Sequence, residues 1–82
     1  MVELTTGQVV RAAAGHDKGR FFIVLKRQGR ILFLCDGKRR PMAAPKKKKD
    51  IHVHPTLTVL QPDEYKTDKA IRIALRPFAE QV

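Results

Sequence analysis

Two short apolar runs limit what this chain can fold into more than any other feature of its sequence. Phe21–Leu25 and Ile31–Cys35 have five residues each, and they are rich in aromatic, β-branched and large aliphatic side chains that favour strands. Gln28 and Gly29 separate them, and a two-residue connection that ends in glycine indicates a β-hairpin. The centre of the chain therefore predicts an antiparallel sheet.

The residues around this hairpin predict further strands. Val9 and Val10 favour a strand before the polar, glycine-bounded loop Ala13–Gly19. Asp36-Gly37 suits the positive φ angles of a type I′ turn, so the chain from Lys38 should fold back as a third antiparallel partner. We expect strands at Gln8–Ala12, Arg20–Arg27, Arg30–Cys35, Lys38–Ala44 and Thr56–Leu60.

Neither apolar run alternates cleanly between apolar and polar residues, which indicates that both faces of the sheet are covered. If Phe21, Ile23 and Leu25 face the inside of a small barrel, then Phe22 and Val24 lie on the outer face and need a cover of their own. We expect the C-terminal part of the chain to supply that cover.

Residues 61–82 differ in character from the rest and predict a helix. Thr67 or Asp68 suits the cap of a helix over Lys69–Arg76, and Pro77 should end or kink it. Its apolar face holds Ile71, Ala74, Leu75 and Phe78, and Arg72 and Arg76 share another face. The expected organisation is a barrel over residues 1–60 and a helical extension over residues 61–82 that packs on it.

The net charge of the chain limits the classes of partner that it is expected to bind. Its 82 residues fit one domain with a small core, and 17 Lys and Arg against 8 Asp and Glu give a net charge of +9. Such a field attracts nucleic acid or an anionic membrane surface. The apolar runs are far shorter than a membrane span, and MVELTTGQVVR does not resemble a signal peptide. With a single cysteine, we expect a cytoplasmic protein without a membrane partner.

Positive charge is concentrated in the segment 38–49, which holds seven basic residues and no acidic one. Pro41 and Pro45 keep it from being helical, and the four adjacent lysines from Lys46 repel one another toward an extended, mobile loop. Two interpretations are open, a solvated charge run or a phosphate-binding arm, and the charge of the whole chain favours the arm.

The histidines and the cysteine do not form a recognisable metal site or catalytic group in the sequence. His52 and His54 would point the same way on an extended segment, but a zinc site needs three or four ligands, so we expect no metal and no cofactor. Cys35 lies within an apolar run, where a thiol is usually inert. His16 and Asp17 are adjacent in a loop, which is weak evidence for a catalytic pair. We do not expect an enzyme or a small-molecule substrate.

The span Gly7–Pro45, with its GxVV opening, GHDKG loop, apolar strand and DGKRR turn, resembles a KOW motif. DGKRR, the PKKKK run and the following IHVH make it similar to the fourteen-e family of large-subunit ribosomal proteins and to short bacterial KOW proteins, over about residues 5–60. This resemblance implies a mainly β fold, a small SH3-like (KOW) barrel of about five antiparallel strands, here followed by a C-terminal amphipathic helix.

The resemblance also implies binding to RNA, expected to be ribosomal RNA or the large ribosomal subunit, through the loop after the first strand and the basic turns. Glycines in that loop would let backbone N–H groups approach phosphate oxygens, and basic side chains would supply charge. The residues expected to contact RNA are Arg11, Gly15, His16, Lys18, Gly19, Arg20, Lys38, Arg39, Arg40, Lys46, Lys47, Lys48 and Lys49. We expect a monomer in the free state. The alternative is a protein-docking SH3-like module of a transcription or translation complex.

Overall fold

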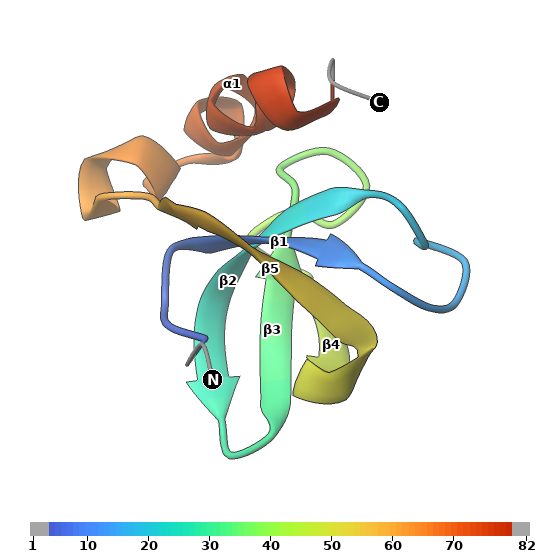
Figure 1. The fold of residues 1–82 in the computed structure, drawn as a ribbon. Coiled ribbons are helices and arrows are strands. Elements are labelled where there is room, and N and C mark those ends of the chain that lie inside the picture. The colour runs from blue at the N-terminus through green and yellow to red at the C-terminus, as the bar shows by residue number, and fades with distance from the viewer. Residues whose placement is uncertain (1–3, 80–82) are drawn as a thin grey trace.

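Five antiparallel strands in one sheet form a small SH3-like barrel, and a helix near the C-terminal end packs on it (Figure 1). The structure, a computed structural model, describes residues 4–79. Its elements in chain order are β1 (Gln8–Ala12), β2 (Phe21–Gln28), β3 (Ile31–Cys35), β4 (Lys46–Lys49), the 3-10 helix η1 (Asp50–His52), β5 (Val53–Val59), the 3-10 helix η2 (Pro62–Tyr65) and α1 (Asp68–Ala79). The predicted fold class is confirmed.

The strands lie in the order β4-β3-β2-β1-β5, and every neighbouring pair is antiparallel. The predicted hairpin joins β2 to β3, where Gln28 pairs with Ile31. Its turn therefore consists of Gly29 and Arg30, one residue later than predicted, and Gly29 takes a φ of 59°. Glycine suits this position because a side chain disfavours positive φ.

Strand β5 pairs with β1 and forms one edge of the sheet. It begins at Val53, three residues before the predicted start, so His54 lies within the strand rather than before it. Pro55 sits in the middle of β5, opposite Val10. An edge strand accepts proline because only one side of it has a partner that needs an N–H group.

The predicted strand Lys38–Ala44 is wrong. The chain after β3 forms a loop over residues 36–45, and the antiparallel partner of β3 is β4, the lysine run itself. The Asp36 carboxylate prevents an immediate return because it accepts hydrogen bonds from the N–H groups of Lys38 and Arg40, at 2.9 and 2.8 Å. These bonds close a local turn instead of a hairpin.

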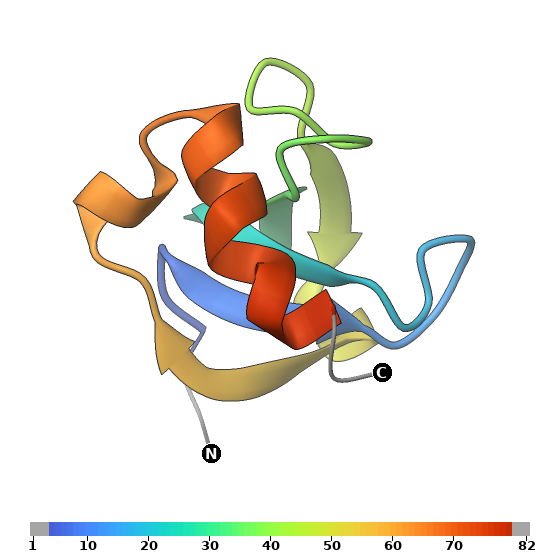
Figure 2. The ribbon, with the colours of Figure 1, turned by 90° about the horizontal axis from the view of Figure 1, so that it is seen from above.

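Two apolar clusters stabilise the molecule, one inside the barrel and one beneath α1. The barrel interior contains Leu4, Val10, Ala12, Phe22, Val24, Leu32, Leu34 and Val53. The second cluster joins Val9, Ile23, Cys35 and Leu60 to Ile71 and Leu75 of the helix, with Phe21 and Leu25 packed against it. Seen from above, α1 lies across the barrel and covers this second cluster (Figure 2).

The predicted assignment of faces is therefore reversed. Phe22 and Val24 point into the barrel, whereas Phe21, Ile23 and Leu25 meet the helix. The two alternating sets of β2 are similarly apolar, so their composition does not indicate which one faces inward. Which face of β2 points into the barrel depends on the curvature of the sheet and on the face that α1 covers.

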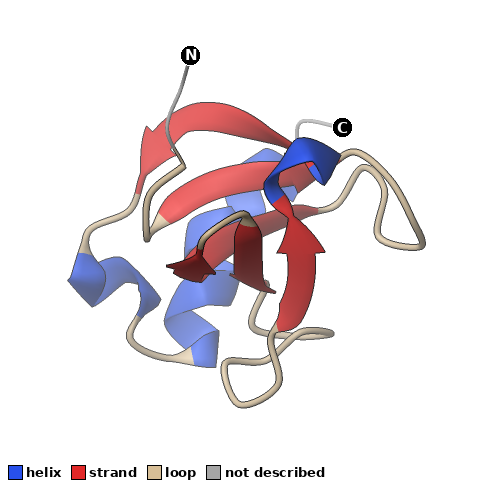
Figure 3. Cartoon of the chain, turned by 90° about the horizontal axis from the view of Figure 1, so that it is seen from below, coloured by secondary structure: helices blue, strands red, loops and turns tan. Residues whose placement is uncertain are grey.

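Helix α1 follows the prediction at its start and differs at its end. The Thr67 hydroxyl accepts a hydrogen bond from the Ala70 N–H at 3.0 Å, as an N-cap residue does. Pro77 does not end the helix, which continues to Ala79. Pro77 has no N–H group to donate to the carbonyl oxygen of Ile73, so one hydrogen bond of the last turns is absent although the backbone stays helical. Seen from below, η1 lies in front of the sheet and α1 behind it (Figure 3).

Candidate functional site

Two polar loops meet at one end of the barrel, the β1–β2 loop (residues 13–20) and the β3–β4 loop (residues 36–45). Asp17 of the first loop lies 3.2 Å from the guanidinium of Arg40 in the second, and the Asp17 residue is only 4% exposed. Lys48 on β4 donates a hydrogen bond of 2.7 Å to the carbonyl oxygen of Ala14. These contacts hold three segments of the chain in one fixed arrangement.

Glycine conformation and backbone hydrogen bonds define the shape of the β1–β2 loop. Gly15 and Gly19 have φ angles of 82° and 88°, which allow the chain to reverse within a few residues. The N–H groups of Lys18, Gly19 and Arg20 donate to carbonyl oxygens within the loop and at the end of β1. These N–H groups are therefore occupied, and the loop presents the exposed side chains of His16, Lys18 and Arg20.

The β3–β4 loop begins beneath α1. Gly37 is buried with a φ of 78°, and its carbonyl oxygen accepts a 2.6 Å hydrogen bond from Arg72 of the helix. A Cβ atom at Gly37 would collide with the backbone carbonyl oxygen of Asp68, so glycine is required for this close approach. The turn leaves Lys38 and Arg39 exposed beside the β1–β2 loop.

The lysine run is extended, as predicted, but it forms the paired strand β4 and not a loop. Pairing with β3 fixes the backbone of β4 and places successive lysines on opposite faces, which separates their charges. Lys47 and Lys49 are exposed, whereas Lys46 and Lys48 are partly buried. The ammonium group of Lys47 lies 5.6 Å from the centre of the Phe33 ring, close enough for a cation–π contact.

The predicted site residues differ in how far they are available to a partner. Arg11 lies on β1 opposite His54, and its guanidinium lies close to Gly19. Arg11, Gly15, His16, Lys18, Arg20, Lys38, Arg39, Lys47 and Lys49 are exposed, and Gly19, Arg40, Lys46 and Lys48 are partly buried. Arg40 and Lys48 hold the loops together, so we expect them to position the site more than to contact a partner directly.

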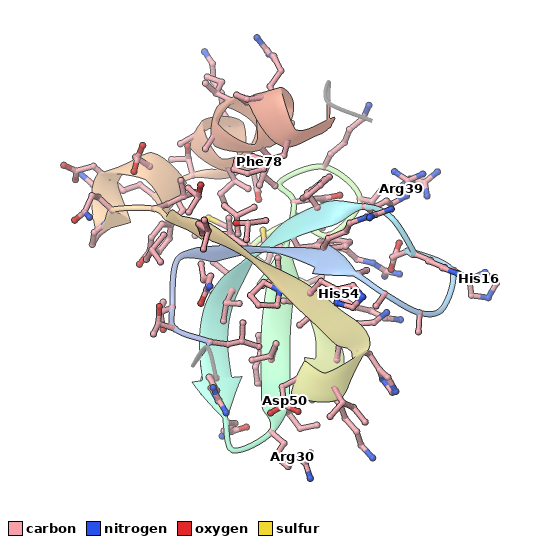
Figure 4. All side chains as sticks on the ribbon, viewed as in Figure 1. His16, Arg30, Arg39, Asp50, His54 and Phe78 are labelled. Atoms are coloured by element: carbon pink, nitrogen blue, oxygen red, sulfur yellow. The ribbon has the colours of Figure 1, made fainter. Side chains whose placement is uncertain are left out.

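Apart from Asp17 and Asp36, which are bonded within the loops, the acidic residues Asp50 and Asp63 lie on other parts of the molecule. Asp50 approaches Arg27 and Arg30 at 3.6 Å each, at the end of the barrel away from the two loops (Figure 4). His16 and Arg39 point outward on the loop side of the same view. Asp63 lies in η2, on the far side of the sheet from the β1–β2 loop. The positive charge that a partner meets is therefore greatest around the loops.

Sequence reasoning missed two residues that extend this basic surface. Arg72 and Arg76 of α1 line a hollow together with Arg20 and Lys38 of the two loops. Their spacing of four residues places them on one helix face, and this pattern was visible in the sequence. The helix lies outside the KOW-like segment, so local sequence patterns do not indicate that this helix face lies next to the loops.

The ion pair between Asp17 and Arg40 yields a stability prediction. Replacing Asp17 with asparagine should lower the free energy of unfolding by about 1–2 kcal/mol, because the partly buried guanidinium loses its charged partner. Asp63→Asn is the control, since Asp63 pairs with Lys66 at an exposed site and its loss should change stability by less than about 0.5 kcal/mol. Urea unfolding followed by circular dichroism measures both. Equal effects would show that the Asp17 pair does not stabilise the loops.

The thiol of Cys35 is poorly suited to nucleophilic chemistry. Burial raises the pKa of Cys35 from 9.0 to about 11, and nearby Asp68 and Asp36 contribute to the increase. The carboxylate next to His16 is also committed elsewhere, because Asp17 binds Arg40.

We expect native Cys35 to react with a thiol reagent such as 5,5′-dithiobis(2-nitrobenzoate) at least ~100-fold more slowly than free cysteine at pH 8. A pKa two units higher leaves about a hundredth of the thiolate at neutral pH, and burial slows access further. The same chain in urea should react at the rate of free cysteine. Fast labelling of the native protein would contradict this environment for Cys35.

Two general features complete the description of the site. Within residues 4–79, no three His, Cys, Asp or Glu side chains are grouped so that they can hold a metal ion. In the same part of the chain, no helix has the length and apolar character needed to cross a bilayer.

No protein-family model matches the chain, and no curated protein shows significant similarity to it. The functional interpretation therefore rests on the geometry and chemistry of the site and on the sequence pattern of its loops.

Proposed function

We propose that this protein binds structured RNA through the loop end of its barrel, and that the RNA is ribosomal. The observation that carries the proposal is the meeting of exposed basic side chains from two loops, with Lys18 and Arg20 on one and Lys38 and Arg39 on the other. The Asp17–Arg40 pair holds these loops in place. A rigid array of cations is suited to a polyanion with regularly spaced phosphates.

The kind of RNA follows from the side chains at the surface. Arg39 has a planar fork suited to bidentate phosphate contact, and lysines supply point charges, so phosphates supply most of the affinity. Tyr65, Phe21 and Phe78 are only partly exposed and pack in the cluster beneath α1. Phe33 is also partly exposed, and the ammonium groups of Lys26 and Lys47 lie over its ring. Within residues 4–79, no row of aromatic rings is therefore presented for stacking successive bases. Recognition therefore depends on the shape of folded RNA.

The ribosomal assignment and the cytoplasmic location belong to the same proposal. They are supported by the KOW-like sequence pattern of the loops and by the single, buried cysteine, which suits a reducing compartment. In this proposal the chain acts as a binding module, with Arg39 and its neighbours in contact with the RNA backbone.

Salt dependence provides a test in solution. A protein that neutralises about five to seven phosphates should show log affinity falling against log salt with a slope on the order of −4 to −6. Fluorescence anisotropy with a labelled hairpin RNA between 50 and 300 mM KCl measures this slope. A flat response would contradict phosphate-based binding.

The identity of the RNA requires an experiment in cells. Crosslinking followed by sequencing of the attached RNA should recover ribosomal RNA, and the protein should travel with the large subunit in a sucrose gradient. Recovery of other structured RNAs would overturn the ribosomal part of the proposal while retaining RNA binding.

A docking function would use a different surface. Leu57 is 99% exposed on edge strand β5, and Val59 on the same strand is 49% exposed. Exposed apolar side chains on a strand edge favour a protein partner. A partner captured equally before and after nuclease treatment, and lost with Leu57→Thr, would favour docking over RNA binding.

A further inference from the structure

The basic surface leads into a hollow of about 460 Å³ between α1, the start of β2 and the β3–β4 loop. Its lining includes Arg20, Phe21, Lys38, Arg72, Leu75 and Arg76. This volume lies within the range of about 300–1,000 Å³ that is typical of small-ligand sites. The hollow is therefore large enough for one ligand group, and its lining indicates what kind.

The walls are cationic. Arg20, Lys38, Arg72 and Arg76 come from three separate segments, and Asp36 is the one acidic residue among the lining residues within residues 4–79. The Asp36 carboxylate already accepts hydrogen bonds from two backbone N–H groups of its own turn. Arg72 is held against the loop by its bond to the Gly37 carbonyl. This arrangement favours an anionic group such as a phosphate.

The floor is apolar. Phe21 and Leu75 belong to the cluster beneath α1, and the Phe21 ring packs against Phe78 with ring centres 5.6 Å apart. A phosphate without a base gains no binding free energy from contact with this floor, because burial of apolar surface stabilises only apolar groups. A flat nucleobase attached to a phosphate matches both the floor and the walls.

The hollow is also continuous with the proposed RNA-binding loops. Arg20, which lines the hollow, lies two residues after Lys18 in the β1–β2 loop. Lys38, which also lines it, lies directly before Arg39 in the β3–β4 loop. We propose that this hollow accepts one unpaired nucleotide of the bound RNA, with its base against Phe21 and Leu75 and its phosphate against Arg20 and Arg76. The inference rests on the proposed RNA binding and makes α1 part of the recognition surface.

The test compares two hairpin RNAs that differ only in one bulged 2-aminopurine nucleotide. Wild-type protein should bind the bulged hairpin about tenfold more tightly than the fully paired hairpin, and binding should protect the 2-aminopurine from acrylamide quenching. Arg76→Gln should reduce this preference to about threefold or less. Lys69→Gln removes the same charge from the same helix outside the hollow, and it should leave the preference unchanged.

The possible failures are distinguishable. Equal affinity for both hairpins, an exposed 2-aminopurine in the complex, or equal loss of preference in both variants would overturn the nucleotide site but not RNA binding. Absence of salt-dependent binding to either hairpin would overturn the proposed function itself, and with it this inference. Free 2-aminopurine ribonucleoside monophosphate should bind far more weakly than the bulged hairpin, because it lacks the flanking phosphates. Equal affinity would identify a free-nucleotide site instead.

Discussion

Replacing Ile71 with alanine should lower the free energy of unfolding by about 3 kcal/mol. Ile71 is 0% exposed and joins α1 to Val9, Ile23 and Cys35 on the outer face of the sheet. Truncation of a buried isoleucine to alanine removes apolar contacts and leaves a cavity, at a typical cost of about 2–5 kcal/mol. A domain of this size has about 4–12 kcal/mol of stability in total, so the loss is a large fraction of it.

Ile73 supplies a matched control on the same helix. It is 52% exposed, and its replacement with alanine should change stability by less than about 0.5 kcal/mol. The chain has no tryptophan, so urea unfolding should be followed by circular dichroism. Similar midpoints for the two variants would contradict the role of α1 as a cover. So would a chain shortened to residues 1–60 that is as stable as the full one.

Removing two exposed charges from the loops should weaken RNA binding by about 10- to 30-fold at 150 mM salt. The variant Lys18→Gln with Arg39→Gln takes one charge from each loop without touching the Asp17–Arg40 pair. Each lost phosphate contact lowers the magnitude of the log–log salt slope by ~0.9, so the slope should fall by about 2. Anisotropy titrations with the same labelled hairpin, repeated across salt concentrations, measure both quantities.

A second double variant has the same net charge and tests whether position matters. Arg30 and Lys66 approach Asp50 and Asp63 on other parts of the molecule, so Arg30→Gln with Lys66→Gln should weaken binding less than about threefold. Its salt slope should match the wild-type slope, because distant exposed charges are largely screened at 150 mM salt. Equal losses in the two double variants would show that only the total charge attracts RNA.

The positions of most strands were predictable because they depend on local properties. Aromatic and β-branched residues in β2 and β3 favour strands in most contexts, and Gly29 marks the turn between them. The N-terminus of α1 was predictable for the same reason, since Thr67 caps it with its own hydroxyl. The exposed charges of the loops could also be found, because Lys18 and Arg39 lie in polar segments that do not enter the core.

The lysine run shows where local reasoning was insufficient. Four adjacent like charges predict a mobile loop, but the unpaired edge of β3 offers hydrogen bonds to the segment that follows the β3–β4 loop. Alternation along β4 separates the charges, and Phe33 offers the face of its ring to Lys47. Pairing across the sheet therefore decided the structure of a segment whose sequence favours disorder.

By itself, the sequence determined a basic, mainly β chain with a C-terminal helix and glycine-shaped polar loops, because strand propensity, turn chemistry and charge are local properties. The tertiary structure decided which face of β2 looks inward, that β4 pairs with β3, and that Arg76 lies near Arg20. These outcomes depend on contacts between segments far apart in the chain. Similarly apolar faces of β2 can be told apart only when the helix covers one of them.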